Sequence, residues 1–418
     1  MKLHNEMIAM GDRAVAAARA LLLLSSRRKN TILQAMADEI DARRTALKEA
    51  NRKDVDEATA EGLPPAMIDR LILTDSRIDA MVHGIRSIIG LKDPIGTRIS
   101  RWIRPNGLEI IKRRVPIGVI AIIYESRPNV TADTAVLCLK TSNAVILRGG
   151  KEAMNSNIAI ADALVAGGIK HGMPKDAIQL IRTADRDAVR ELVQMEGRVD
   201  LAIPRGGEAL IRAVTSQARV PVIKHYKGVC HIYVDESADQ AMAMKIVENA
   251  KCQRPGVCNA MEKLIVHEKI AADFLPKMAE RFRQLKVELR GDEASMQFVP
   301  WMKAATEDDW YAEYLDLILT VKIVPSVRAA VDHINKYGSK HSDAIITEDE
   351  TARKLFLNEV DSAAVYVNAS TRFTDGGEFG MGAEIGISTD KIHARGPMGL
   401  EELTSYKYEI QGNGQIRE

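Results

Sequence analysis

The residues with the clearest chemical potential form the segment Gln253-Arg-Pro-Gly-Val-Cys-Asn259. Its cysteine, Cys258, lies between a predicted helix and a predicted strand. A cysteine thiolate is a strong nucleophile, and Arg254 would favour that ionised form. Gly256 lets the backbone approach a ligand closely, and the N–H groups of Cys258 and Asn259 could donate to an oxyanion. Cys258 could also be a small buried hydrophobic residue, so the segment by itself leaves both interpretations open.

Two glycine-glycine loops follow predicted strands and could hold the phosphates of a nucleotide. They are Arg148, Gly149, Gly150 and Lys151, and then Arg205, Gly206 and Gly207. Backbone N–H groups at the start of a helix, with a cation beside them, form an anion site. Neither loop has the spacing of a dinucleotide fingerprint or of a Walker loop, and each could be a simple turn. Two such loops at successive strand ends favour a nucleotide.

A polar segment, Tyr124-Glu-Ser-Arg-Pro-Asn-Val130, connects an apolar strand to a helix. Ser126 or Asn129 could simply cap that helix. Arg127 could pair with a carboxylate or a phosphate through two parallel hydrogen bonds. The segment is therefore a candidate for binding an anionic substrate.

Two positively charged segments are less specific. Lys391-Ile-His-Ala-Arg-Gly-Pro397 carries His393 and Arg395 between small residues, and it could equally be a solvated surface loop. His225, in Lys224-His-Tyr-Lys227, precedes a predicted strand. A single histidine is more often a hydrogen-bonded structural residue than a catalytic one, so both interpretations of His225 remain open.

The elements that must position these residues follow an α/β pattern. The first 90 residues have helical periodicity, with a break at 61–65 and a later helix that Asp75 or Ser76 could cap. From residue 113 onward short β-rich runs alternate with helical stretches, and a second such passage extends from 261 to 367. This rhythm predicts parallel sheets flanked by helices, with ligands beyond the carboxyl ends of the strands. An alternating run at 403–410 is typical of a terminal strand.

Composition limits the classes of function. The chain has 418 residues, of which 58 are Lys or Arg and 57 are Asp or Glu. This length predicts about two to three domains, and the balanced charge argues against nucleic-acid and membrane partners. No segment approaches the ~20 apolar residues of a membrane span, and the N-terminus is a poor secretory signal. We therefore expect a cytoplasmic protein whose four cysteines are reduced thiols. We expect no metal site, because Cys252 and Cys258 have no partner at a usual zinc spacing.

A set of motifs resembles the gamma-glutamyl phosphate reductase family, also called the glutamate-5-semialdehyde dehydrogenases, of the aldehyde dehydrogenase superfamily. The motifs are Val115-Pro-Ile-Gly-Val-Ile-Ala-Ile-Ile-Tyr-Glu-Ser-Arg-Pro-Asn-Val130, Asn143-Ala-Val-Ile-Leu-Arg-Gly-Gly150, Ile203-Pro-Arg-Gly-Gly207, Lys224-His-Tyr226, Gln253-Arg-Pro-Gly-Val-Cys-Asn259 and His393-Ala-Arg-Gly-Pro397. They occur in the order of the family, and the resemblance extends over essentially the whole chain. Together they are far more specific than any one of them.

The resemblance implies an aldehyde dehydrogenase-like α/β fold with three parts. A Rossmann-like cofactor domain would comprise residues 1–98 and 115–250, and an α/β catalytic domain residues 251–385. A small β oligomerisation flap would comprise 99–114 and 403–411. Its strands would add to the sheet of a neighbouring subunit, which would give a homo-oligomer, either a dimer or a tetramer.

The resemblance also implies a reaction, the NADPH-dependent reduction of L-glutamate 5-phosphate to L-glutamate 5-semialdehyde and phosphate in proline biosynthesis. The Cys258 thiolate would expel phosphate, and the resulting cysteinyl thioester would accept a hydride from NADPH before the aldehyde leaves. Ser126 or Asn129 would replace the asparagine that the superfamily uses in its oxyanion hole. The sequence does not decide between these two residues.

The remaining roles that the resemblance implies concern ligands. The cofactor-binding residues would be Arg148, Gly149, Gly150, Lys151, Arg205, Gly206, Gly207 and Glu313. The substrate-binding residues would be Arg127, His225, His393 and Arg395. A positive charge at Arg148 or Lys151 would suit the 2′-phosphate of NADPH, although the sequence does not separate NADP from NAD.

Two other functions compete with this one. An NAD(P)-dependent oxidising aldehyde dehydrogenase would need the glutamate of a Glu-Leu-Gly-Gly-Lys-like segment to activate water. The matching stretch here, Lys224-His-Tyr-Lys-Gly228, contains no acid. A cofactor-binding protein without turnover would have no reason to keep Cys258. The sequence contains no kinase-like segment, so the acyl phosphate would come from a separate glutamate 5-kinase that could contact this chain transiently.

Overall fold

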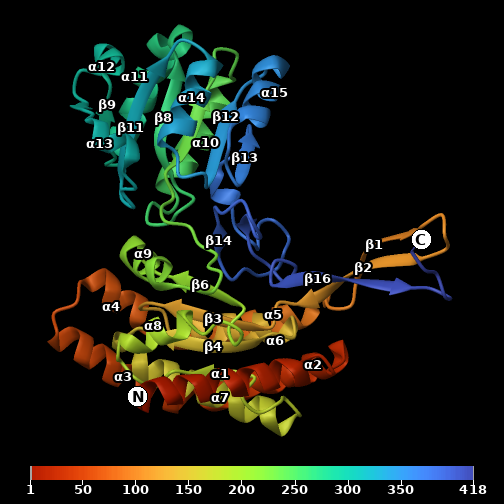
Figure 1. Cartoon of the computed structure of the whole chain (residues 1–418). Helices are drawn as coiled ribbons and strands as arrows, with labels where there is room; N and C mark the ends of the chain where they lie inside the picture. The colour runs from red at the N-terminus through yellow and green to blue at the C-terminus, as the bar shows by residue number, and fades with distance from the viewer. Residues whose placement is uncertain (1, 418) are drawn as a thin grey trace. The chain divides into compact units, whose positions relative to one another are not determined.

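Two compact units make up the computed structural model, which describes residues 2–417 (Figure 1). The first unit comprises the residues through Lys224, together with Met381–Gly386 and the residues from Met398 onward. The second unit comprises His225–Gly380 and Ile387–Pro397. Each has its own parallel sheet, as the alternation of strands and helices predicted.

The first unit is built on a four-stranded parallel sheet with the strand order β5-β4-β3-β6. The strands are β3 (Val119–Tyr124), β4 (Ala144–Gly149), β5 (Ile178–Leu180) and β6 (Leu201–Arg205). All of β3 is buried, as expected for the apolar run of a central parallel strand. The strand order reverses at β3, since β4 lies on one side of it and β6 on the other. A reversal of this kind opens a crevice at the carboxyl edge of the sheet.

Helices cover this sheet in two layers. Helix α1 contacts β3, β4, β5 and α8, while α6 and α7 contact the sheet and each other, and α2 packs on α5 and α7. The elements are α1 (Lys2–Leu21), α2 (Ser26–Ala42), α3 (Arg44–Ala60), α4 (Pro65–Leu71), α5 (Asp75–Gly90), α6 (Asn129–Lys140), the 3₁₀ turn η1 (Lys151–Ala153), α7 (Met154–Lys170), α8 (Asp187–Val193) and α9 (Glu208–Gln217).

The predicted helix boundaries in the first 90 residues are nearly right. The break at 61–65 is confirmed, because α3 ends at Ala60 and α4 begins at Pro65. The prediction that Asp75 or Ser76 caps the next helix is wrong by one or two residues. Thr74 caps α5 instead, because its hydroxyl lies 3.2 Å from the backbone N–H of Arg77 and accepts its hydrogen bond.

A separate three-stranded antiparallel sheet has the order β1-β2-β16. Its strands are β1 (Arg98–Ile103), β2 (Glu109–Pro116) and β16 (Thr404–Gln411). The two distant segments expected to form the flap therefore do pair, with Lys112 opposite Tyr408. Trp102, Ile103 and Ile410 are exposed on it, which leaves apolar surface open to a partner.

The second unit is built on a seven-stranded parallel sheet with the order β10-β9-β11-β8-β7-β12-β13. Its strands are β7 (Cys230–Val234), β8 (Met261–His267), β9 (Glu288–Gly291), β10 (Lys303–Ala304), β11 (Ile318–Val324), β12 (Ser342–Ile346) and β13 (Ala364–Val367). Two hydrophobic clusters flank it, one with residues of α10 and α11 and one with residues of α14 and α15. The sheet is thus buried on both faces.

The helices of the second unit connect successive strands. They are α10 (Gln240–Cys252), α11 (Glu268–Gln284), α12 (Glu293–Phe298), α13 (Glu307–Tyr311), α14 (Val327–Tyr337) and α15 (Glu350–Glu359). A 3₁₀ turn, η2 (Thr371–Phe373), and a small hairpin of β14 (Ile387–Ser388) and β15 (Gly396–Pro397) follow β13. The helices expected before Cys258 and in the second α/β passage are therefore present.

The expected boundary between the cofactor and catalytic domains, at residues 250 and 251, requires correction. The two units separate between Lys224 and His225. The reason is that β7 pairs with β8 and β12 of the second sheet, so β7 and α10 belong to the second unit. The segment Met381–Gly386, which overlaps the end of the expected catalytic domain, belongs to the first unit.

Membrane-spanning helices and metal-binding clusters are both absent from residues 2–417. None of the helices in this range is both long enough and apolar enough to cross a membrane. Within the same range, His, Cys, Asp and Glu side chains form no group of three or more that could hold a metal ion.

A buried histidine makes the second unit sensitive to acid. His333 on α14 packs its ring against Tyr337, Trp310 and His231, with centroid distances of 4.5, 5.1 and 5.8 Å. Its Nε2 has no hydrogen-bond partner among the described residues. The pKa of His333 is lowered to about 2, mainly by burial and to a smaller extent by the nearby charges of His231 and Lys322. His333 is therefore neutral in the folded chain.

Acidification should destabilise the protein through His333. Between pH 6.5 and pH 2 the unfolded chain binds a proton at this residue that the folded chain does not bind, so stability is lost as the pH falls. Lowering the pH from 7 to 5 should remove about 2 kcal/mol through this group. The measurement is the urea midpoint of wild type and His333→Phe at both pH values, with a smaller loss expected in the variant. The exposed His83 provides the control, because H83F should keep the wild-type dependence; an equal loss in H333F would contradict the prediction.

Candidate active site

Cys258 lies at the amino edge of the second sheet. Helix α10 ends at Cys252 and β8 begins at Met261, and residues 253–260 between them form what we call the cysteine loop. The segments that precede β7, β11, β12 and β13 reach the same edge, because all of these strands are parallel. The expectation that ligands bind at carboxyl ends therefore fits the loops of the first sheet but not the position of Cys258.

Backbone packing under Cys258 is very close. A Cβ atom on Gly228 would lie 2.5 Å from both the Cα and the carbonyl carbon of Cys258, a distance that real Cβ contacts do not show. Only glycine lets these two backbone segments approach so closely. The thiol of Cys230 lies 3.2 Å from the carbonyl oxygen of Cys258 and donates to it, and the Gly228 N–H donates to Glu313 Oε1 over 2.8 Å. The position of Cys258 is thus fixed through its main chain.

Asn259, the next residue, is fixed by the segment 371–374. Its side-chain amide donates to the carbonyl oxygens of Arg372 and Thr374, at 3.3 and 2.9 Å. Its own carbonyl accepts from the Thr371 hydroxyl at 2.7 Å. The Arg372 guanidinium donates to Asn259 Oδ1 and, over 2.8 Å, to Oε1 of Gln253 at the other end of the cysteine loop. Arg372 therefore spans the loop that carries the thiol.

The cysteine loop is electropositive. Burial lowers the pKa of Arg372, the neighbouring charge of Arg254 lowers it further, and charge on Cys258 acts in the opposite direction. A guanidinium nevertheless remains protonated in proteins. Arg372 is thus a cation that spans the loop carrying Cys258, and Arg254 is a second cation in the same loop.

The other three cysteines are chemically less favourable. Burial raises the pKa of the thiols of Cys138, Cys230 and Cys252. Each of them is a free cysteine that favours the unreactive thiol form. The complete burial of Cys138 and Cys230 is typical of cysteines that serve as packing residues.

Three of the four residues predicted to bind substrate lie in the second unit, and their surroundings differ from one another. His225 Nδ1 lies 2.9 Å from the carbonyl oxygen of Ile387, and its ring meets that of His341 edge to face. Arg395 pairs with Asp361 at 2.8 Å, and Lys391 and Lys340 pair with the same carboxylate. These cations hold the pKa of Asp361 well below its usual range. His393 is exposed in the same segment as Arg395.

The loops of the first unit meet at the carboxyl edge of its sheet. Glu152, after β4, accepts from both the backbone N–H and the hydroxyl of Ser126, after β3, at 2.7 Å each. Glu125, also after β3, accepts from the backbone N–H of Gly207, after β6, at 2.9 Å. A Cβ on Gly206 would lie 2.7 Å from Cδ of Glu125, the far end of a flexible side chain that packs against this loop. The structure therefore brings the two glycine loops and the segment 124–130 together.

The two cations of the first glycine loop differ in their surroundings. Arg148 is half-buried and donates to the carbonyl oxygens of Gly149 and Ala184, at 2.9 and 3.2 Å. Its Nε is buried and has no partner among the residues that the structure describes. Burial lowers the pKa of Arg148, although Glu152 opposes this effect. The Lys151 side chain is 63% exposed and pairs with Glu61 at 2.9 Å, so its ammonium can exchange partners with a ligand.

Ser126 and Asn129, predicted for the oxyanion hole, both belong to the first unit, whereas Cys258 belongs to the second. Ser126 has a positive φ of 41°, which is unusual for a residue with a side chain. The Asn129 amide donates to Asp133 over 2.8 Å. Burial raises the pKa of Asp133 to about 6, against the opposing effects of Asn129 and Arg205. Arg127 lies exposed between Ser126 and Asn129, just before α6.

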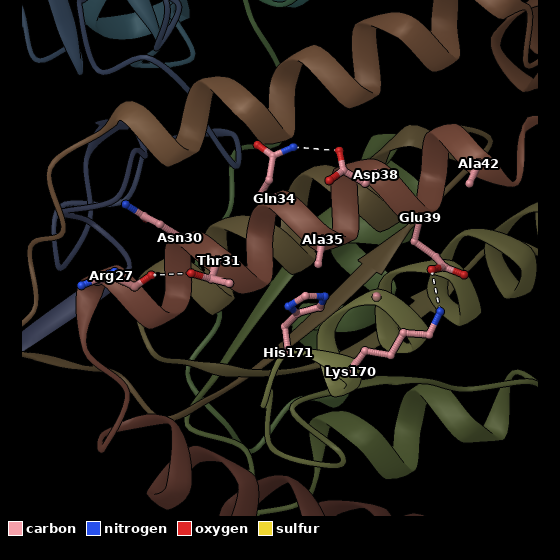
Figure 2. A pocket seen from close by; sticks show the side chains of 11 residues that line it. Arg27, Asn30, Thr31, Gln34, Ala35, Asp38, Glu39, Ala42, Lys170 and His171 are labelled. Atoms are coloured by element: carbon pink, nitrogen blue, oxygen red, sulfur yellow. Dashed lines mark hydrogen bonds and ion pairs between the residues drawn. The ribbon is translucent and has the colours of Figure 1, made fainter.

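Two cavities of the first unit can be compared with the positions of the predicted site residues. The smaller, about 300 Å³, is lined by Glu61, Leu63, Met67, Glu125, Ser126, Lys151 and Glu152, and so includes two of the predicted residues. The larger, about 940 Å³, lies over α2 and the end of α7, where Figure 2 shows Lys170 paired with Glu39 and Gln34 paired with Asp38. It contains none of the predicted residues, so its size does not identify the site.

Sequence reasoning missed two features of the site. Arg372 carries no local motif and is 113 residues from Asn259 in the chain, so no spacing rule could connect them. Gly228 stands out in the sequence only as the end of a stretch without an acid. A glycine at the start of a strand can mark a close approach of another backbone, and that signal could have identified it.

Comparison with known proteins gives consistent results. Residues 4–316 match the Aldehyde dehydrogenase family. A curated gamma-glutamyl phosphate reductase from Aquifex aeolicus is 56% identical to this chain, and the match covers 97% of this chain and 95% of the relative. A second one, from Thermodesulfovibrio yellowstonii, is 51% identical, and the match covers 100% of each of the two chains. The crystal structure of gamma-glutamyl phosphate reductase from Thermotoga maritima has a TM-score of 0.97 at 49% identity, covering 99% of this chain and 100% of that one. An acetylating aldehyde dehydrogenase from Geobacillus thermoglucosidasius, at 18% identity and a TM-score of 0.69 with 100% and 98% coverage, shares the fold.

Replacing Gly228 with alanine should displace Cys258. The new Cβ would overlap the Cys258 backbone, so G228A should lose about 1–3 kcal/mol of stability, as overpacked sites do. The rate at which iodoacetamide alkylates Cys258 should also depart from wild type, relative to Cys252 in the same sample, as followed by mass spectrometry. Gly84 in α5 has open space where a Cβ would lie, and G84A should leave both readouts unchanged or slightly improve stability. Wild-type stability and reactivity in G228A would show that the close approach does not matter.

Proposed function

Since the chain belongs to the aldehyde dehydrogenase family, and within it to the gamma-glutamyl phosphate reductases, we propose that it reduces L-glutamate 5-phosphate to L-glutamate 5-semialdehyde and phosphate, with NADPH as the reductant, in proline biosynthesis. The observation that carries the proposal is the environment of Cys258. Its backbone is fixed by Gly228 and Asn259, and the Arg372 guanidinium spans its loop from Gln253 to Asn259. The other three thiols lie where burial disfavours the thiolate.

The chemistry divides one difficult step into two easier ones. The Cys258 sulfur attacks the acyl carbon of the substrate, the bond from that carbon to the phosphate oxygen breaks, and phosphate leaves with its electron pair. The thioester that remains is reduced by a hydride, which NADPH supplies when bound. The carbon–sulfur bond then breaks, the carbonyl re-forms, and the thiolate is regenerated. Thiolate serves both as nucleophile and as leaving group, which makes covalent catalysis feasible in both halves.

Positive charge near the thiol would assist both halves. Arg254 and Arg372 would stabilise the thiolate before attack, and they offer a site for the anionic phosphate. Backbone N–H groups of Cys258 and Asn259 would stabilise the oxyanion, as would Ser126 or Asn129 if the superfamily role transfers to them. The proposed contacts for the substrate carboxylate and phosphate are Arg127, His225, His393 and Arg395. These assignments rest on the family motif.

Water must be kept from the thioester. The stretch at 224–228 has no acid, and it contributes the backbone of Gly228 beneath Cys258. The Glu313 carboxylate accepts the hydrogen bond of the Gly228 N–H. Phosphate rather than water is therefore the proposed acyl partner.

The glycine loops of the first unit fit a dinucleotide. They lie at the carboxyl edge of a parallel sheet beside a reversal of strand order, which is where such ligands bind. Lys151 offers an exposed cation for the 2′-phosphate, whereas Arg148 is held by backbone carbonyls. Arg205, Gly206 and Gly207 would bind the second part of the cofactor, and Glu313 would bind near the nicotinamide ribose.

The remaining proposals concern partners and location. The exposed apolar residues of β1 and β16 would pair with a second copy of the chain, giving a dimer or tetramer. The substrate would come from a separate glutamate 5-kinase, with which contact would be transient. The free cysteines suit a reducing compartment, so we propose the cytoplasm.

The reaction is best tested in reverse, because the acyl phosphate is unstable. Wild-type protein with NADP and glutamate 5-semialdehyde should form NADPH only when inorganic phosphate is present, since phosphate must cleave the thioester. The Cys258→Ala variant should form none. Cys252→Ala, which removes another free thiol of the second unit, should retain activity. NADPH formation that does not depend on phosphate would mean that water takes the acyl group and would favour an oxidising aldehyde dehydrogenase.

Cofactor preference should depend on Lys151. A charge-assisted hydrogen bond to the 2′-phosphate contributes roughly 1.5–3 kcal/mol to binding. Removing it should therefore raise KM for NADP by about 10-fold or more and should have little effect on KM for NAD. The measurement compares K151A with wild type for both cofactors. Lys170 is a matched control, because it is also 63% exposed and paired with a glutamate of the first unit. Equal changes for NADP and NAD in K151A would exclude a role in recognising the 2′-phosphate.

A further inference from the structure

A buried ion pair joins the two ends of the cysteine loop. Lys251, in the last turn of α10, lies 2.9 Å from Glu262 in β8, and both side chains are completely buried. The second carboxylate oxygen of Glu262 accepts the backbone N–H of Leu315 at 3.1 Å. Buried charges are costly unless they are paired and hydrogen-bonded, and both conditions are met here. Neither residue belongs to the machinery described above.

Glu262 occupies an irregular position in its strand. Cys230 of β7 pairs with Met261 of β8, but the next residue, His231, pairs with Lys263. Glu262 is therefore the extra residue of a β-bulge, and bulges redirect side chains next to active sites. Adjacent residues of a regular strand would instead point to opposite faces.

The bulge allows two adjacent residues of β8 to hold one segment, residues 312–315. Glu262 accepts from the Leu315 N–H at one end of it. The Lys263 ammonium donates to the Ala312 carbonyl at the other end, over 2.7 Å. Leu315 itself has a φ of 55°, a left-handed conformation that residues with side chains adopt only where their surroundings enforce it.

The segment 312–315 in turn touches the backbone of the nucleophile. It carries Glu313, which accepts the Gly228 N–H at 2.8 Å, and Gly228 packs directly under Cys258. The carbonyl oxygen of Leu315 also lies beside Gly256, at 3.7 Å from the place of a Cβ there. The contacts therefore form a closed circuit from the ends of the cysteine loop back to Cys258.

We propose that Glu262 is a positioning residue for Cys258: by accepting the Leu315 N–H while paired with Lys251, it holds the segment 312–315 and, through Glu313 and Gly228, the backbone of the nucleophile. The proposal rests on the proposed function for the role of Cys258 as nucleophile. A purely structural ion pair would instead add only to the stability of the unit. Removing one partner of a buried pair is strongly destabilising, whereas replacing both by uncharged residues is often neutral.

Two uncharged double variants separate these roles. K251M/E262Q keeps a side-chain oxygen that can accept from Leu315, while K251M/E262M lacks it. We expect K251M/E262M to lower kcat in the phosphate-dependent assay by about 10- to 100-fold with little change in KM, as misplacement of a reacting group does. K251M/E262Q should stay close to wild type. Hydrogen exchange at the amides of Gly228 and Leu315 should be slow in wild type and in K251M/E262Q, and fast in K251M/E262M.

Wild-type kcat and slow exchange in K251M/E262M would overturn the proposal. If wild-type protein shows no phosphate-dependent turnover, the proposed function fails, while the exchange comparison still decides whether Glu262 positions Gly228 and Leu315. If K251M/E262M does not fold, the measurements on wild type and on K251M/E262Q test the proposal. Fast exchange of the Leu315 and Gly228 amides in wild type would then overturn the proposal, and slow exchange together with near-wild-type kcat in K251M/E262Q would support it.

Discussion

The close packing of Gly228 against the backbone of Cys258 is the constraint on which the second unit depends. It leaves no room for a side chain at position 228 and so requires glycine. The Gly228 N–H is satisfied by Glu313, and the Cys258 carbonyl by the Cys230 thiol, because polar groups at such a tight contact need partners. Cys258, the proposed nucleophile, is thus held by main-chain contacts.

The candidate site residues lie at the carboxyl edge of the first sheet and at the amino edge of the second. The first sheet presents its carboxyl edge, where the strand order reverses at β3 and three loops are tied together by Glu125 and Glu152. The second sheet presents its amino edge, where α10 ends and β8 begins around Cys258. The proposed cofactor loops suit the carboxyl edge, because helix N-termini there offer N–H groups to phosphates. The cysteine loop is instead flanked by the Lys251–Glu262 ion pair and spanned by the Arg372 guanidinium.

Much of the fold could be predicted because its signals are local. The apolar run 119–124 and the alternation that follows it are typical of buried parallel strands, and both sheets formed as expected. The boundary between the units could not be found in this way. The strand β7 has the same apolar pattern as the strands before it, and only its pairing with β8 and β12 assigns it to the second unit. Periodicity reveals that a strand exists but not which sheet it joins.

The sequence by itself determined the family, the α/β class and the candidate nucleophile, because the residues around Cys258 and the glycine loops are contiguous motifs. Only the tertiary structure decided which distant residues complete the site. Arg372 reaches Asn259 across 113 residues, and Glu262 holds Leu315 across 53. Such contacts depend on strand order and on one bulged residue, which set the positions of side chains far apart in the chain. Local spacing carries no information about them, since it is the pairing of β7, β8 and β11 that brings these segments to one edge.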